Sequence, residues 1–198
     1  AKEKAMNIIK EYLRENDCYK SATIMQIKGI MIHSVGCNVE NPLNFIKSWN
    51  KSKVYKCVHA FISPYAIYET LPYNYRAWHC GKGIKGSFND GYISVELTEP
   101  KTINYIKGSL FTDNDEKYTK RYVKACYDVA VDYFAYLCEK FALEPLDKNI
   151  VLSHSEGHKM GYASNHGDVE HIWNYANLSM EEFRQDIKTK IIKNKVIK

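Results

Sequence analysis

Histidine and carboxylate side chains are concentrated between residues 150 and 173. Four of the seven histidines of the chain lie in this segment with three acidic residues, namely His154, His158, His166, His171, Glu156, Asp168 and Glu170. Neutral imidazole and carboxylate groups are the ligand types that a borderline cation such as Zn²⁺ prefers. The segment alone leaves two interpretations open: a metal site, and a solvated polar loop with capping residues.

Two earlier polar residues lie at or within apolar segments that have the composition of buried strands. Residues 26–34 run through Ile-Met-Ile to His33, and residues 92–97 carry Glu96. Ligands of open α/β sheets bind beyond the carboxyl ends of the strands, so one cleft could hold both residues beside His154. The alternatives are a core imidazole in the first segment and an edge carboxylate that faces water in the second.

A catalytic zinc site needs three protein ligands and one open position for water. His33, His154 and Asp168 form a suitable set, provided that the chain folds back on itself between the last two. His158 is the competing ligand, because it follows His154 by four residues and would share a helical face with it.

The spacing of apolar residues predicts alternating helices and strands. The predicted helices span residues 4–16, 41–50, 115–141 and 179–192. The predicted strands span residues 26–34, 58–62, 66–71, 92–97 and 150–152, of which the second and third would form a hairpin. This order predicts an α/β fold: a single domain over residues 1–198 with a central mixed β-sheet flanked by helices. Residues 1–25 would form an N-terminal helical segment, and residues 179–198 a C-terminal helix with a basic tail.

The composition is that of a globular protein, with 45% hydrophobic and 26% charged residues. Sixteen tyrosines suit a carbohydrate or peptide groove, and also suit half-buried core positions. The net charge of +5 weakly favours a polyanionic partner such as nucleic acid, cell wall or a membrane surface. No apolar run is long enough to span a bilayer, and the N-terminal residues lack the apolar region of a signal peptide.

The six cysteines are scattered, with no CxxC pair. A domain of this size does not need a disulfide framework, so we expect a reduced environment and little chemistry from any of them. Cys126 and Cys138 fall on the apolar face of a predicted helix and are expected to be buried free thiols.

Six stretches of the sequence occur together, in the same order, in a known enzyme family. They are NDCYKS (16–21), KGIMIHSVGC (28–37), VHAFI (58–62), IYETLPYNYRAWHCG (67–81), YISVELTEP (92–100) and HSEGHKMGYASNHGDVEHIW (154–173). On these stretches the chain resembles the zinc-dependent N-acetylmuramoyl-L-alanine amidases of the phage-lysozyme and peptidoglycan-recognition-protein superfamily, above all the clostridial and phage-endolysin branch. The resemblance implies one Zn²⁺ at the edge of a central mixed sheet.

The resemblance also implies roles for particular residues. It places the three zinc ligands on His33, His154 and Asp168, and the catalytic carboxylate on Glu96. Many members carry a lysine that supports the oxyanion where this chain has His166, so this chain departs from the family there. A second departure is a valine in NHGDVEH, where the branch typically has proline.

The Trp-His pair of the family's substrate loop falls on Trp78 and His79. Tyr68 and Tyr75 are further candidates for the glycan or peptide groove, with hydrophobic packing as the alternative for these aromatic residues. His59 and His171 are expected either to orient metal ligands or to pack as buried polar groups.

The implied activity is hydrolysis of the amide between N-acetylmuramic acid and L-alanine in peptidoglycan, with zinc, by a monomeric endolysin or autolysin that acts on the bacterial cell wall. Retention of both His ligands, Asp168 and Glu96 argues against a non-catalytic peptidoglycan-binding module. A basic metal-dependent nuclease fits less well, because dense Lys/Arg clusters are absent outside the tail. We therefore expect neither a nucleic-acid partner nor a membrane span.

Overall fold

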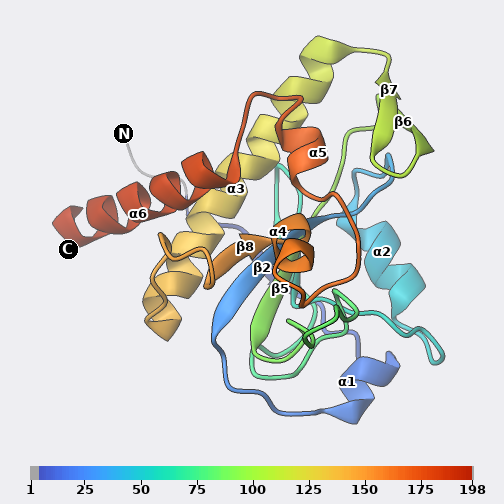
Figure 1. Cartoon of the computed structure of the whole chain (residues 1–198), viewed down its shortest axis with the longest axis vertical. Coiled ribbons are helices and arrows are strands. Elements are labelled where there is room, and N and C mark those ends of the chain that lie inside the picture. The colour runs from blue at the N-terminus through green and yellow to red at the C-terminus, as the bar shows by residue number, and fades with distance from the viewer. Residues whose placement is uncertain (1–4, 198) are drawn as a thin grey trace.

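A six-stranded mixed sheet in the order β1-β4-β3-β5-β2-β8 forms the centre of the computed structural model, which describes residues 5–197 (Figure 1). The strands are β1 (Ile8–Lys10), β2 (Gly29–Ser34), β3 (Ala60–Ile62), β4 (Ile67–Glu69), β5 (Tyr92–Leu97) and β8 (Val151–Ser153). All neighbouring strands are parallel except the β3–β4 hairpin. The predicted α/β fold with a central mixed sheet is confirmed.

Helices cover both faces of this sheet. They are α1 (Asp17–Ser21), α2 (Pro42–Trp49), α3 (Glu116–Phe141), α4 (His154–Lys159), α5 (Glu170–Trp173) and α6 (Met180–Ile197). The long helices α3 and α6 pack side by side, and both contribute to the larger core cluster. None of the helices in the described residues is both long enough and apolar enough to cross a membrane.

Alternation along β2 separates the core face from the functional face of the sheet. Ile30 and Ile32 pack in the larger core cluster beneath α3 and α6, whereas Met31 belongs to a smaller cluster. Because successive strand side chains point to opposite faces, His33 projects on the side of Met31, away from α3. His33 is paired in register with Glu96 on β5, so the two polar residues share that face.

The two long helices begin near the predicted residues, and α3 also ends where it was predicted to end. Asp115 caps α3 by accepting the Tyr118 N–H at 3.0 Å, and the buried residues of α3 follow the predicted apolar stripe. Ser179 caps α6 in the same way, with the Glu182 N–H at 3.1 Å. The helix α6 continues to Ile197, further than its sequence pattern predicted.

The predicted helix over residues 4–16 is wrong. Within the described part of this segment, Ile8–Lys10 is strand β1, which pairs in parallel with the free edge of β4. Tertiary pairing therefore overrides the helical spacing, and the helix α1 begins only at Asp17, after the capping residue Asn16. Residues 1–4 and 198, which belonged to the predicted N-terminal helical segment and basic tail, lie outside the described residues.

A second sheet and a disulfide were both missed. The hairpin β6 (Ile103–Lys107)–β7 (Leu110–Asp113) stands apart from the main sheet. Cys18 and Cys57 form a disulfide, which contradicts the expectation of a reduced environment with little chemistry from the six cysteines. The fold brings these two α-carbons to 6.4 Å although they are 39 positions apart in the sequence. The other four cysteines are free, and the expectation for Cys126 and Cys138 is confirmed.

A buried arginine connects α6 to the helix that begins with His154. The Arg184 guanidinium donates to both oxygens of Glu156, at 2.5 and 2.6 Å, and to the Val151 carbonyl at 2.8 Å. Glu156 is also part of a capping box with Ser153 at the start of α4. Arg184 thereby fixes the helix start from which the His154 side chain projects.

We predict that Arg184→Met lowers the free energy of unfolding by about 3 kcal/mol, because the Glu156 carboxylate loses its buried partner. Urea denaturation monitored by tryptophan fluorescence measures this loss. Arg121→Met, at an exposed position on α3, is the matched control and should change stability by less than about 0.5 kcal/mol. Equal stability of the two variants would contradict the structural role of Arg184.

Candidate active site

Three polar side chains from separate parts of the chain meet beyond the carboxyl end of β2. His33 is the penultimate residue of β2, His154 is the first residue of α4, and Asp168 lies in the loop that precedes α5. The Ser155 N–H donates to the Asp168 carbonyl at 2.9 Å, and the Ser34 N–H donates to the Asp168 carboxylate at 3.3 Å. The loop folds back on the start of α4, as the spacing of His154 and Asp168 required.

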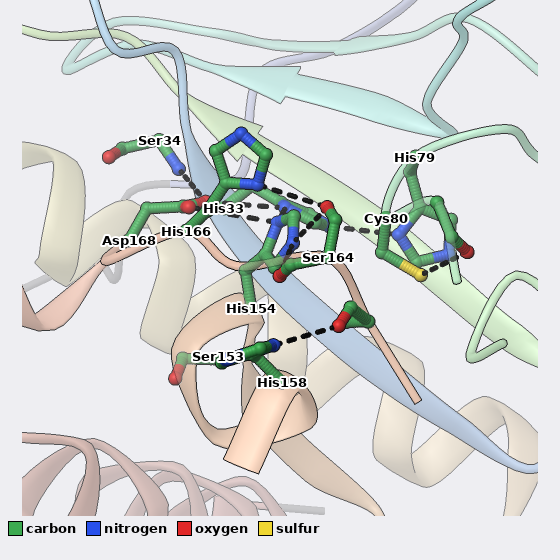
Figure 2. A network of polar contacts seen from close by, with 12 residues as sticks. His33, Ser34, His79, Cys80, Ser153, His154, His158, Ser164, His166 and Asp168 are labelled. Carbon is green, nitrogen blue, oxygen red and sulfur yellow. Dashed lines mark hydrogen bonds and ion pairs between the residues drawn. The ribbon is translucent and has the colours of Figure 1, made fainter. Parts of the chain in front are cut away.

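The potential ligand atoms of these residues all lie within 4.8 Å of one another (Figure 2). The Nδ1 atoms of His33 and His154 are 3.0 Å apart. The Asp168 carboxylate lies 3.3 Å from His33 Nδ1 and 3.6 Å from His154 Nδ1. Both histidines are buried, and Asp168 is mostly buried.

The Nε2 atoms of His33 and His154 point away from the cluster, and each has a partner there. These contacts leave the two Nδ1 atoms free to bind a cation between the rings. His154 Nε2 faces the Ser164 carbonyl at 3.0 Å, and because a carbonyl only accepts, Nε2 carries the proton of the neutral ring. Nδ1 of His154 then presents a lone pair toward His33 and Asp168. His33 Nε2 contacts His79 Nδ1 at 2.8 Å, which can hold the His33 ring in the matching tautomer. The donor set of two imidazoles and one carboxylate therefore suits a metal such as zinc.

The protonation states within this cluster follow from burial and from its internal charges. Burial and, to a smaller extent, the neighbouring His33 together lower the pKa of His154 to about 4. Burial also disfavours a charged His33, but the Asp168 hydrogen bond, with the charges of Glu96 and Asp168, raises the pKa of His33 above its usual value. Burial opposes the charge of Asp168 too, yet the hydrogen bond and charge of His33 hold its pKa at about 2. The carboxylate is thus ionised and available as a ligand.

Glu96 lies on β5 beside the cluster and is partly exposed to the cavity in front of it. Burial among protein atoms raises the pKa of Glu96 to about 8, against the opposing charge of His33. Such a perturbed carboxyl group in a cleft is typical of functional sites.

His166 is exposed and lies in the same loop as Asp168. Its Nδ1 is 3.0 Å from the Ser164 hydroxyl, and its ring centroid is 4.7 Å from that of His154. The Ser164 hydroxyl is also 3.2 Å from His154 Nε2, so Ser164 joins the two histidines. The side chain of His166 therefore lies beside the cluster of His33, His154 and Asp168, and it is exposed to solvent.

The cluster opens into a cavity of about 830 Å³. The residues that line the cavity include His33, His154 and Asp168, and also Glu96, Trp78, His79 and His166. A cavity of this size accommodates a substrate segment of several residues.

The structure places other predicted residues away from the cavity. Tyr68 packs against the core cluster that contains Phe61, and the Tyr75 ring lies 5.7 Å from Tyr19. Neither tyrosine lines the cavity, because each ring faces a hydrophobic contact instead. His158 is turned toward the Ala163 carbonyl, 3.1 Å from its Nδ1, and does not join the three-residue cluster (Figure 2).

His59 is a satisfied core histidine. Its Nε2 donates to the Tyr75 carbonyl at 2.7 Å, and its Nδ1 accepts the Ser94 N–H at 2.9 Å. Burial accordingly lowers the pKa of His59 to about 4. Of its two predicted alternatives, the structure therefore supports packing as a buried polar group.

One wall of the cavity carries a polar network that the sequence interpretation lacked. The Tyr105 hydroxyl from β6 lies 2.6 Å from Glu99 and 2.7 Å from His171 Nε2. Tyr105 and His171 line the cavity, whereas Glu99 is buried behind them, and burial raises its pKa to about 7. The two residues Gly108-Ser109, between short segments that contain Ile, Tyr, Leu and Phe, were the available signal for this hairpin.

A His-His-Asp donor set beside a strand carboxylate, open to a cavity of substrate size, is the arrangement of a metal-dependent hydrolase. Residues 23–170 match the family described as N-acetylmuramoyl-L-alanine amidase, and the chain belongs to this family. It is a peptidoglycan amidase, which cleaves the amide bond between N-acetylmuramic acid and L-alanine. No curated protein sequence matches the chain.

Solved structures of low sequence identity share the fold. Staphylococcus aureus hydrolase AmiA, solved in complex with its ligand, is 19% identical, with a TM-score of 0.69 over 97% of this chain and 85% of that one. The PlyG catalytic domain is 21% identical, with a TM-score of 0.65 over 94% and 96% of the two chains. A mutant endolysin from Bacillus subtilis is 17% identical, with a TM-score of 0.64 over 92% and 99%. At these identities the likeness establishes the fold alone.

Proposed function

We propose that the amidase reaction depends on one zinc ion held by His33, His154 and Asp168. The observation that carries this proposal is the convergence of their ligand atoms within 4.8 Å at the cavity. Zinc bound there would polarise the scissile carbonyl and lower the pKa of the attacking water. Two neutral imidazoles and a carboxylate leave one position open for these groups, as a catalytic zinc site requires.

In this proposal Glu96 is the general base. Its register pairing with His33 places it beside the cluster, and it faces the cavity in which the substrate would bind. Glu96 takes a proton from the attacking water and delivers it toward the leaving amine of L-alanine. The hydrogen-bonded pairing of strands β2 and β5 holds Glu96 at a fixed position beside His33, the proposed metal ligand.

His166 would donate a hydrogen bond to the oxyanion that forms on the carbonyl. Its contact with the Ser164 hydroxyl can orient the ring, and its exposed edge borders the cavity. Trp78 and His79 form part of the substrate wall, and His79 also orients His33 through their 2.8 Å contact. Tyr68 and Tyr75 have no part in this proposal, because they do not reach the cavity.

The biological setting that fits this activity is the bacterial cell wall, where the enzyme would act as an endolysin or an autolysin and as a monomer. Purified peptidoglycan digested with the protein should release peptides that begin with a free L-alanine amine and leave intact muramic acid on the glycan. Mass spectrometry identifies these ends. A chelator should stop the release, and added zinc should restore it. New reducing sugar ends would indicate a glycosidase, and cuts within the peptide an endopeptidase.

We predict that Glu96→Gln lowers kcat by about 10²-fold or more, the scale expected when a general base is lost. The amide keeps the shape of the side chain, so zinc content and the unfolding midpoint should stay near those of the wild type. Steady-state kinetics with metal analysis of the same samples measures both. If zinc is lost with activity, Glu96 is a ligand or a structural group instead of the base.

We predict that His166→Ala lowers kcat by about 10²–10³-fold while zinc stays bound, as expected for removal of one oxyanion donor. His166→Lys should restore much of the activity, because a lysine ammonium can donate to the same oxygen. These kinetics and metal contents distinguish a donor from a residue that only shapes the Asp168 loop. Loss of zinc in His166→Ala without rescue by lysine would support the second role.

A further inference from the structure

Lys56 is the single lysine or arginine among the described residues that line the cavity. The other formally charged side chains of the lining are Glu96 and Asp168, which belong to the reaction centre. The Lys56 ammonium is therefore the one permanent positive charge among the described residues of the cavity wall. An anionic group of the substrate could bind to it.

The backbone around Lys56 is held in place from both sides. The Lys56 carbonyl accepts a hydrogen bond from the fully buried Asn16 side chain at 3.0 Å. The next residue, Cys57, is bonded to Cys18, and its N–H donates to the Trp78 carbonyl at 3.0 Å. Lys56 is thus attached to the same frame as the Trp78 wall of the cavity.

The Lys56 side chain is positioned but not neutralised. Its ammonium lies 4.8 Å from the centre of the Trp49 ring, a cation–π contact, and Trp49 packs edge-on against Phe61. No carboxylate of residues 5–197 forms an ion pair with Lys56. Lys56 is exposed, so its ammonium is accessible to an anion that enters the cavity from solution.

The substrate contains one candidate anion close to the reacting bond. N-acetylated sugars carry no charge, whereas the second residue of the stem peptide is a D-glutamate whose α-carboxylate is either free or amidated. One residue of extended chain spans about 3.5 Å, so this carboxylate would lie roughly one residue length from the scissile amide. Lys56 lines the same cavity as His33, His154 and Asp168.

We propose that Lys56 binds the free α-carboxylate of the second stem-peptide residue and makes the enzyme prefer acidic over amidated stems. The inference rests on the proposed function, since it takes the scissile amide to be cleaved at the His33–His154–Asp168 cluster. It assigns the Trp49–Lys56–Trp78 wall to the peptide part of the substrate. The ammonium and the carboxylate form a charge-assisted hydrogen bond that an amide cannot replace at equal strength.

The test uses two synthetic N-acetylmuramoyl tripeptides that differ only in the α-carboxylate or α-carboxamide of the second residue. The zinc-loaded wild type should show a kcat/KM ratio of acid to amide of about tenfold or more, corresponding to about 1.4 kcal/mol. Lys56→Met should bring the ratio close to one, mainly through a higher KM for the acid. Lys56→Arg should keep the preference, because the guanidinium also binds carboxylates.

Lys51→Met is the matched control, since Lys51 is an exposed lysine of the same loop that does not line the cavity. It should keep the wild-type ratio. An unchanged ratio in Lys56→Met, or a wild type without preference that still cleaves both substrates, would overturn the inference and leave the amidase mechanism intact. A wild type that releases L-alanine amines from neither tripeptide nor from peptidoglycan would overturn the proposed function and the inference together.

Discussion

The Nδ1 atoms of His33 and His154 lie 3.0 Å apart inside the protein, and this contact governs the rest of the site. Two imidazole lone pairs do not face each other at that distance unless a proton or a cation lies between them. The Asp168 carboxylate beside them adds a negative charge that favours the cation. The site is consequently built to hold positive charge at one point, and the surrounding elements serve to bring three side chains to that point.

A different structural feature holds each of those side chains in place. Strand alternation turns His33 away from the hydrophobic core, and the β2–β5 register places Glu96 on the same face. A capping box formed by Ser153 and Glu156 starts α4 at His154. Arg184 on α6, thirty residues after His154, donates to Glu156 and so stabilises this helix start. The C-terminal helix is thus part of the support of the active site as well as of the core.

Local sequence patterns predicted the features that local physics determines. His33 and Glu96 were singled out because they lie in apolar strands, and the family resemblance supplied their expected roles. The helix α3 was predicted because its apolar stripe repeats at helical spacing. The segment around Ile8 and Ile9 was predicted wrongly, because its apolar spacing fits a helix. In the fold it pairs with the open edge of β4 and forms a strand instead. The Cys18–Cys57 disulfide joins positions that only the complete fold brings together.

The proposed substrate wall, formed by Trp49, Lys56 and Trp78, shows the same limit of sequence-based prediction. Trp78 was singled out because the family resemblance places it in the substrate loop, whereas Lys56 lies in a lysine-rich stretch with nothing local to distinguish it. Tyr68 and Tyr75 have the right chemistry for a groove, but their positions in the fold direct them into hydrophobic contacts. Residue type predicts what a side chain can do, and only the tertiary arrangement decides which side chains reach the substrate.

The most direct test of the account is a crystal structure of the zinc-loaded protein with data collected at the zinc absorption edge. We expect one anomalous peak, bounded by Nδ1 of His33, Nδ1 of His154 and the carboxylate of Asp168, with Glu96 outside the ligand set. A peak coordinated through Nε2 atoms, or one that includes His158 or Glu96 in place of Asp168, would contradict it.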